Sequence, residues 1–232
     1  MALAPSALGI QAQRQVLPRE GRTQQISDLP PPPQNPKRTT GGGRRDGGSC
    51  PQDAKTATQS LTALSPEIEP GSTLSDYPTF FVSVPTTSAK TAEFSLFDQT
   101  RRGIYQTTFT LTGTPSIVRF TLPSNAPPLA VGQTYTWAFA LICEPNNRRR
   151  DRLTTGWIRR IQLAPAQLRQ ITQAVAKERV LLYRKVGIWY ETLSAVIELQ
   201  RAQPTDPTLE VAWKDLLQSG GLNPTAIQPL RK

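Results

Sequence analysis

The sequence of 232 residues has 27 lysines and arginines against 17 aspartates and glutamates, no histidine and two cysteines. Without histidine, the chain cannot build a Ser-His-Asp or Cys-His nucleophilic site or a histidine-ligated metal site, and two cysteines cannot make a four-cysteine zinc site. We therefore expect no catalytic residue, no metal and no cofactor. The length is that of one or two compact domains.

The formal net charge of +10 is spread along the chain. Positive and negative residues number 8 and 6 in 1–75, 10 and 5 in 76–164, and 9 and 6 in 165–232. Such diffuse charge indicates solubility, or weak attraction to anionic surfaces such as glycans and lipid headgroups. We do not expect a nucleic-acid partner, because such proteins usually concentrate lysine and arginine on one arm or stripe.

The first 60 residues lack the pattern of a folded domain. Residues 1–13 are small and apolar, and Ile10-Gln11-Ala12 resembles the end of a secretory signal whose basic start is missing. We therefore predict a truncated export signal, with an ordinary terminus as the alternative. Residues 14–60 hold a proline run (29–36) and a glycine run (41–48), which predict a disordered linker. The proline run is a spacer or, alternatively, a ligand for an aromatic groove.

We assign residues 61–163 to a β domain. From Tyr77 the pattern changes to short runs of β-branched and aromatic residues separated by turn residues. Such runs, with turns every 8–12 residues, indicate an antiparallel sandwich or barrel. In the second run, alternation places Phe94 opposite to Glu93. The predicted strands cover 79–84, 92–97, 104–111, 117–122, 134–143 and 156–163.

One local pattern sharpens the fold prediction. Leu129, Gly132 and Tyr135 have the spacing of a tyrosine corner, in which a tyrosine at the start of a strand bonds its hydroxyl to backbone a few residues upstream. Because that corner is typical of these sandwiches, we predict a β-sandwich of the fibronectin-III/immunoglobulin-like kind.

Residues 164–222 show helical spacing of apolar residues. Pro165 can begin a helix, and the predicted helical segments are 165–175, 177–186, 189–203 and 208–219. The stretch from Tyr183 to Pro204 resembles the junction of two tetratricopeptide helices, but a single unit cannot form a solenoid. We expect a small helical hairpin region on the sandwich, hence an α+β fold, with peptide binding in a groove as an alternative and 223–232 as a tail.

Cys50 and Cys143 are the only cysteines. In a chain with an export signal, an isolated pair favours a disulfide, which would fix the end of the linker to the end of the longest strand. Two free thiols in a cytoplasmic protein are the alternative. A catalytic thiol is disfavoured, because no histidine is present to lower its pKa.

The densest charge lies between residues 144 and 152, where Asn146-Asn147 favours a turn. We expect its arginines to project into water. The loop is then either a solvated hairpin tip or an anion contact, since a guanidinium fork matches carboxylate and phosphate geometry. The candidate contact residues are Arg148, Arg149, Arg150 and Arg152.

Several segments together resemble one family. The segments are Tyr77-Pro-Thr-Phe-Phe-Val-Ser-Val-Pro85, Ala92-Glu-Phe, Ile104-Tyr-Gln-Thr-Thr-Phe, Asn125-Ala-Pro-Pro-Leu129, Tyr135-x-Trp-x-Phe139, Cys143-Glu-Pro, Gly156-Trp-Ile, Glu178-Arg and Gly187-Ile-Trp-Tyr190. From about Gly48 to Gly221 the chain resembles the cyanobacterial domain of unknown function 928. That resemblance implies an export signal followed by a Gly/Pro-rich linker, and it carries over no catalytic residue.

These features favour a non-catalytic exported protein, periplasmic, in the cell envelope or secreted, with a binding or scaffolding role. Its expected partners are anionic glycans or another envelope protein, and no apolar run is long enough to span a membrane. If the start is correct and no signal exists, the location is cytoplasmic. One alternative function is a carbohydrate- or anionic-polymer-binding module. A third is a hydrolase with paired carboxylates, drawn from Asp76, Glu93, Asp98, Glu144 and Asp151.

Overall fold

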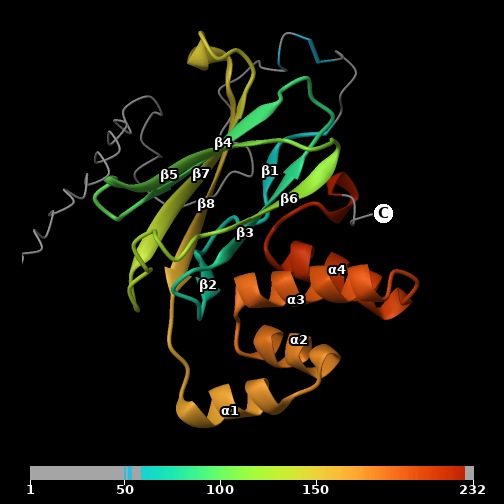
Figure 1. Ribbon diagram of the computed structural model, residues 1–232. Coiled ribbons are helices and arrows are strands. Elements are labelled where there is room, and N and C mark those ends of the chain that lie inside the picture. The colour runs from blue at the N-terminus through green and yellow to red at the C-terminus, as the bar shows by residue number, and fades with distance from the viewer. Residues whose placement is uncertain (1–49, 51, 54–58, 228–232) are drawn as a thin grey trace, which may run out of the picture.

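A computed structural model of the chain describes residues 50, 52–53 and 59–227 (Figure 1). The predicted export signal at 1–13 lies outside these residues, as does most of the predicted linker at 14–60. Cys50, placed in the linker by the sequence, is buried, and so is Ile227, placed in the C-terminal tail.

The described strands form two sheets, which with the helices confirm the α+β class (Figure 1). All strand pairs among the described residues are antiparallel except β2 with β8. The smaller sheet has the order β1 (Thr62–Ala63), β3 (Thr79–Val84) and β6 (Ser116–Thr121). The larger has the order β2 (Gly71–Thr73), β8 (Arg152–Arg160), β7 (Thr134–Ile142), β4 (Thr91–Phe97) and β5 (Gly103–Thr110).

Aromatic side chains from both sheets form the centre of the core. The rings of Phe80 in β3 and Phe94 in β4 lie 4.8 Å apart, and Phe94 stacks on Phe120 of β6 at 4.3 Å. Trp137 of β7 lies 5.3 Å from Phe80. Since β3 and β6 belong to one sheet and β4 and β7 to the other, the two sheets face each other across these rings. The alternation predicted for β4 places Phe94 among these rings and Glu93 on the other side of the strand.

The predicted hydrogen bond of Tyr135 is present. Its hydroxyl accepts a hydrogen bond from the backbone N–H of Ala130 at 2.9 Å, at the start of β7. The bond fixes the turn that enters β7 and satisfies a backbone donor that the turn would otherwise leave unpaired.

Within the described part of the chain, four α-helices follow β8, close to the predicted segments. They are α1 (Pro165–Gln173), α2 (Ala176–Lys185), α3 (Trp189–Ala202) and α4 (Pro207–Ser219). Two short 3-10 helices, η1 (Arg148–Arg150) and η2 (Pro224–Ala226), complete the described elements. Helix α3 contacts β2 and β3 on the sandwich and has α2 and α4 as neighbours, whereas α1 packs on α2 (Figure 1).

Helix α3 is joined to the sandwich by a buried tyrosine. The Tyr190 hydroxyl accepts a hydrogen bond from Trp137 Nε1 at 2.8 Å and donates to the carbonyl of Trp157 at 3.0 Å. The residue is 1% exposed, and burial raises the pKa of Tyr190 far above its ordinary value. The hydroxyl therefore stays protonated and connects the helices to both β7 and β8.

We expect Tyr190→Phe to lower the free energy of unfolding by about 1–3 kcal/mol, because it leaves the buried indole N–H of Trp137 without its acceptor. The carbonyl of Trp157 keeps the hydroxyl of Ser65 as a donor. Thermal or urea unfolding measures the loss. Tyr183→Phe on α2 is the matched control, since no hydrogen bond of its hydroxyl is seen within the described residues. Equal stability of the two variants would contradict the role assigned to Tyr190.

Candidate functional site

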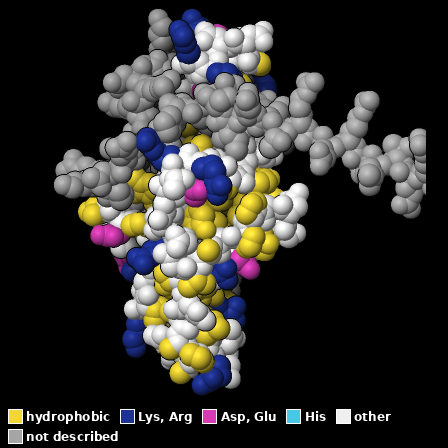
Figure 2. Space-filling model, turned by 90° about the vertical axis from the view of Figure 1, so that its left-hand side faces the viewer, with side chains coloured by type: hydrophobic (Ala, Val, Ile, Leu, Met, Phe, Trp, Pro, Cys, Tyr) yellow, Lys and Arg dark blue, Asp and Glu magenta, His cyan; other side chains and the backbone are white. Residues whose placement is uncertain are grey.

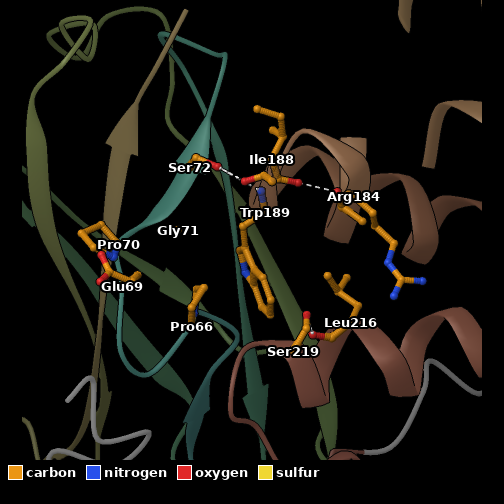
Figure 3. Close-up of a pocket in the computed structure, with 12 residues that line it drawn as sticks. Pro66, Glu69, Pro70, Gly71, Ser72, Arg184, Ile188, Trp189, Leu216 and Ser219 are labelled. Carbon is orange, nitrogen blue, oxygen red and sulfur yellow. Dashed lines mark hydrogen bonds between the residues drawn. The ribbon is translucent and has the colours of Figure 1, made fainter. Parts of the chain in front are cut away.

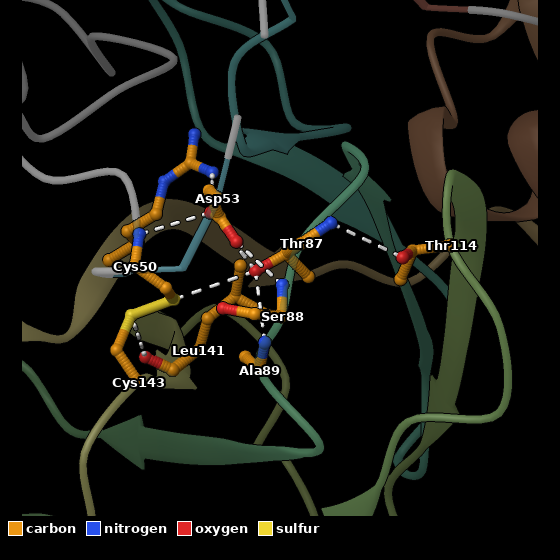
Figure 4. Close-up of polar contacts among 9 residues, drawn as sticks. Cys50, Asp53, Thr87, Ser88, Ala89, Thr114, Leu141 and Cys143 are labelled. Atoms are coloured by element: carbon orange, nitrogen blue, oxygen red, sulfur yellow. Dashed lines mark hydrogen bonds and ion pairs between the residues drawn. A yellow bond between two sulfur atoms is a disulfide. The ribbon is translucent and has the colours of Figure 1, made fainter. Parts of the chain in front are cut away.

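The two cysteines meet at one end of the sandwich, as a disulfide between Cys50 and Cys143 with the Cα atoms 5.0 Å apart (Figure 4). Cys143 follows β7, so the bond attaches a segment that precedes β1 to the end of a central strand. The sequence prediction of this pairing is confirmed.

Asp53 fixes the turn that carries Cys50 (Figure 4). Its carboxylate accepts hydrogen bonds from the N–H groups of Cys50 (3.0 Å) and Ser88 (2.5 Å) and from the Thr87 hydroxyl (3.2 Å). Arg152 adds an ion pair at 3.5 Å. Burial alone raises the pKa of Asp53, but the hydrogen bonds outweigh it and hold the pKa below its ordinary value.

The arginine loop differs from expectation, because its side chains do not all project into water. Arg148 contacts Glu93 at 3.0 Å and Asp151 at 2.5 Å, and its side chain is 27% exposed. Arg150 pairs with Glu144 at 2.8 Å. The physical reason lies in β4, where Glu93 faces away from Phe94 and the core, so it needs a cation on the outer side of the sheet.

Arg152, next to the loop's 3-10 turn, is also largely buried, with 16% of its side chain exposed against Asp53. Within the described residues, Arg149 is the one candidate contact residue that forms no ion pair. Carboxylates therefore neutralise most of the loop's charge, and the loop closes the end of the sheet as a network of ion pairs. Burial is the main reason that the pKa of Asp151 lies above its ordinary value, although Arg148 opposes the shift.

A cleft of about 320 Å³ separates the sandwich from the helices (Figure 3). Its walls come from the segment before and including β2, the α2–α3 turn and α4. Glu69 and Arg184 lie at opposite sides, as Figure 3 shows. The apolar lining is Pro66, Pro70, Ile188, Trp189 and Leu216.

Trp189 is the rigid wall of this cleft. Its indole N–H donates to the carbonyl of Leu64 at 3.0 Å. A Cβ at Gly220 would lie 2.3 Å from the ring, so the backbone there approaches the indole as only glycine permits. The Ser72 hydroxyl donates to the carbonyl of Gly187, so this polar group is already used within the molecule (Figure 3).

Glu191 joins α3 to the residues after β2, beside the cleft. Its Oε1 accepts hydrogen bonds from the Thr73 hydroxyl (2.7 Å) and from the N–H groups of Leu74 (2.9 Å) and Ser75 (3.3 Å). Its Oε2 is buried without a hydrogen-bond partner in the described part of the chain. Burial therefore raises the pKa of Glu191, even though the hydrogen bonds lower it in part.

Within the described residues, no group of three or more histidine, cysteine, aspartate or glutamate side chains is arranged to hold a metal ion. Glu93 and Asp151 do meet in space, but Arg148 lies between them. Sequence reasoning missed Asp53 and Glu191, since neither lies in a motif; the one available signal was an acidic residue in the first turn of a helix at Glu191.

We expect Arg148→Ser to destabilise the fold by about 2–3 kcal/mol, because Glu93 and Asp151 lose their cation. The cost is below that of breaking a fully buried pair, since Arg148 is partly exposed. Arg149→Ser is the matched control and should leave the melting temperature nearly unchanged. Calorimetry of the two variants measures the difference, and an Arg148→Ser variant as stable as its parent would contradict the network.

We also expect the difference in stability between Glu191→Gln and the parent to shift in favour of the glutamine as pH rises from about 4 to about 7. A carboxyl with a raised pKa in the folded state stabilises most when protonated, so the parent loses stability as pH increases through that range, whereas glutamine does not titrate. Urea unfolding at several pH values measures the shift. A stability difference between the two proteins that does not change with pH would contradict the assignment to Glu191.

Comparisons with known proteins assign the chain to a family. A comparison with curated proteins finds no match. The family model described as Domain of Unknown Function (DUF928) matches residues 40–230, which include the disulfide, both sheets and the helices α1 to α4. Since the match covers well over half of the sequence, the chain belongs to the DUF928 family.

Proposed function

We propose that this chain is a non-catalytic binding or scaffolding protein of the cell envelope or of the space outside the cell. The observation that carries the proposal is the disulfide between Cys50 and Cys143. Disulfides form and persist in oxidising compartments such as the periplasm, and they are rare in the cytosol. That chemistry supports a periplasmic, envelope or secreted location.

The sandwich itself supports a scaffolding role, and we infer that it belongs to the fibronectin-III/immunoglobulin-like class. Support comes from the smaller sheet of β1, β3 and β6 opposite a sheet in which β7 lies between β4 and β8. The Tyr135 hydrogen bond at the start of β7 adds the tyrosine corner. Many cell-surface domains use this architecture to present loops and edges to partners.

Binding of a carbohydrate or other anionic polymer is the second candidate, and the free guanidinium of the arginine loop favours it. Arg149 is exposed and forms no ion pair within the described residues, unlike Arg148, Arg150 and Arg152. Any anion contact by this loop therefore runs chiefly through Arg149. The hydrolase alternative has less support, because the two carboxylates that meet, Glu93 and Asp151, are already held by Arg148.

The export proposal is tested on the native full-length product. We expect fractionation to recover it from the periplasm, envelope or medium, N-terminal sequencing to reveal a processed start, and mass spectrometry of non-reduced peptides to find Cys50 joined to Cys143. Recovery from the cytoplasm with two alkylatable thiols would contradict the proposal.

A double variant compared with the parent measures what the disulfide contributes to the free energy of unfolding. Cys50→Ser with Cys143→Ser removes the bond, and chain-entropy reasoning for a loop of this length predicts a loss of roughly 4–5 kcal/mol. Treatment with a reductant should destabilise the parent and leave the double variant unchanged.

A further inference from the structure

We name the stretch from Arg159 to Gly187 the helical arm. Its first two residues, Arg159 and Arg160, end β8 and are paired within the large sheet, and the rest protrudes from the sandwich. It contains the end of β8, helices α1 and α2, and the turn into α3, and it lies at the lower end of the molecule in Figure 1. Helix α1 buries one side chain, Ile171, and α2 buries one, Val180. Most of the surface of both helices therefore faces solvent.

The helical arm concentrates the positive charge of the protein. Its 29 residues hold seven lysines and arginines and one acid, Glu178, a net charge of +6 out of +10 for the whole chain. Three of the cations pair with Asp76, Asp206 and Asp215 of the rest of the chain. The seven are Arg159, Arg160, Arg169, Lys177, Arg179, Arg184 and Lys185.

Three of these cations are free to meet a partner. Arg159, Arg169 and Lys185 are exposed and form no ion pair within the described part of the chain. This is the reverse of the arginine loop, where carboxylates of the same chain neutralise most of the charge.

Large apolar side chains are exposed on the same helical arm. Leu168, Val175 and Leu181 are 45%, 70% and 63% exposed. On α2, Lys177, Leu181 and Lys185 are spaced by four residues, so they follow one line along the helix. Figure 2 shows hydrophobic and Lys/Arg side chains together at the narrow lower end of this face, with no Asp or Glu among them.

The combination of charge and apolar exposure selects the partner. Single exposed apolar residues are normal on a protein surface, and charge alone would suit any polyanion. Cationic helices with exposed leucine and valine are typical of the interface of a membrane, where headgroup phosphates meet the cations and the acyl boundary receives the apolar side chains.

We propose that the helical arm docks the protein onto an anionic lipid bilayer, with Arg159, Arg169 and Lys185 at the headgroups and Leu168, Val175 and Leu181 inserted at the interface. In this arrangement the arm lies on the surface of the bilayer and does not cross it. No described helix is long and apolar enough to cross a membrane. The inference rests on the proposed envelope function and deepens it by naming a partner.

The first experiment measures co-sedimentation of the full chain with vesicles of phosphatidylcholine alone or with about 30% phosphatidylglycerol. We expect binding to the anionic vesicles only, weakened by salt. Arg169→Gln with Lys185→Gln should lower the partition coefficient by about 25-fold, since each basic residue near the surface contributes about fivefold. Leu168→Ser with Leu181→Ser should also weaken binding.

The control replaces exposed residues of the same kinds outside the helical arm. Val211→Ser with Arg201→Gln, on α4 and α3, should bind vesicles as the parent does. Parent-like binding by both arm variants would overturn the proposal. A second result would also overturn it: binding to soluble dextran sulfate that depends on the arm charges, together with vesicle binding that the leucine substitutions do not change. An anionic polymer would then be the partner.

A second measurement uses the unaltered protein and so does not depend on a variant that folds. Anionic vesicles should protect Lys177 and Lys185 from amine-labelling reagents, as mass spectrometry detects, while Lys90 and Lys214 stay reactive. Uniform labelling of all four would overturn the docking. If the protein is found outside the cytoplasm but does not bind vesicles, the docking proposal alone is refuted. If it is found in the cytoplasm with free thiols, the export proposal alone is refuted.

Discussion

The hydroxyl of Tyr190 is the contact on which the rest of the arrangement depends. It places one polar atom inside an aromatic core, where an unpaired group would be costly, and it satisfies that atom with Trp137 on β7 and the backbone of Trp157 on β8. The close fit has a further requirement, because a Cβ at Gly156 would lie 2.6 Å from the Trp137 ring. A glycine in β8 thus makes room for the tryptophan that the tyrosine holds.

This anchor explains how the chain can keep an exposed helical arm. The arm begins at the end of β8, which is paired within the large sheet, and it ends just before Trp189 and Tyr190, which are buried against the sandwich. Both ends are therefore fixed, and α1 and α2 need to bury only Ile171 and Val180 to hold their places. Because α1 and α2 bury so few side chains, most of their outer surface is available for a partner.

The sequence predicted the regular elements well and the long-range polar contacts poorly. Alternation placed Phe94 in the core and Glu93 on the other side, but the partner of Glu93 is 55 residues away in a loop, so no local pattern could identify it. Strand β2 was missed because Gly71-Ser-Thr73 has too few residues to show an alternating pattern. Its extended conformation is fixed by pairing with β8. Local periodicity reports which face is buried; it does not report which charges meet.

The same limitation affected the charge. The three segments 1–75, 76–164 and 165–232 made the positive charge look spread along the chain, because the boundary at residue 164 cuts the helical arm in two. The fold separates the charges differently. At the end that carries η1, carboxylates neutralise the arginines beside the disulfide, and at the opposite end in Figure 1 the arm keeps its cations. A molecule with more unpaired cations at one end is oriented by an anionic surface, since the field acts on the unneutralised charges. The disulfide end would then point away from that surface, and the loops at that end of the sandwich would face a partner on the opposite side.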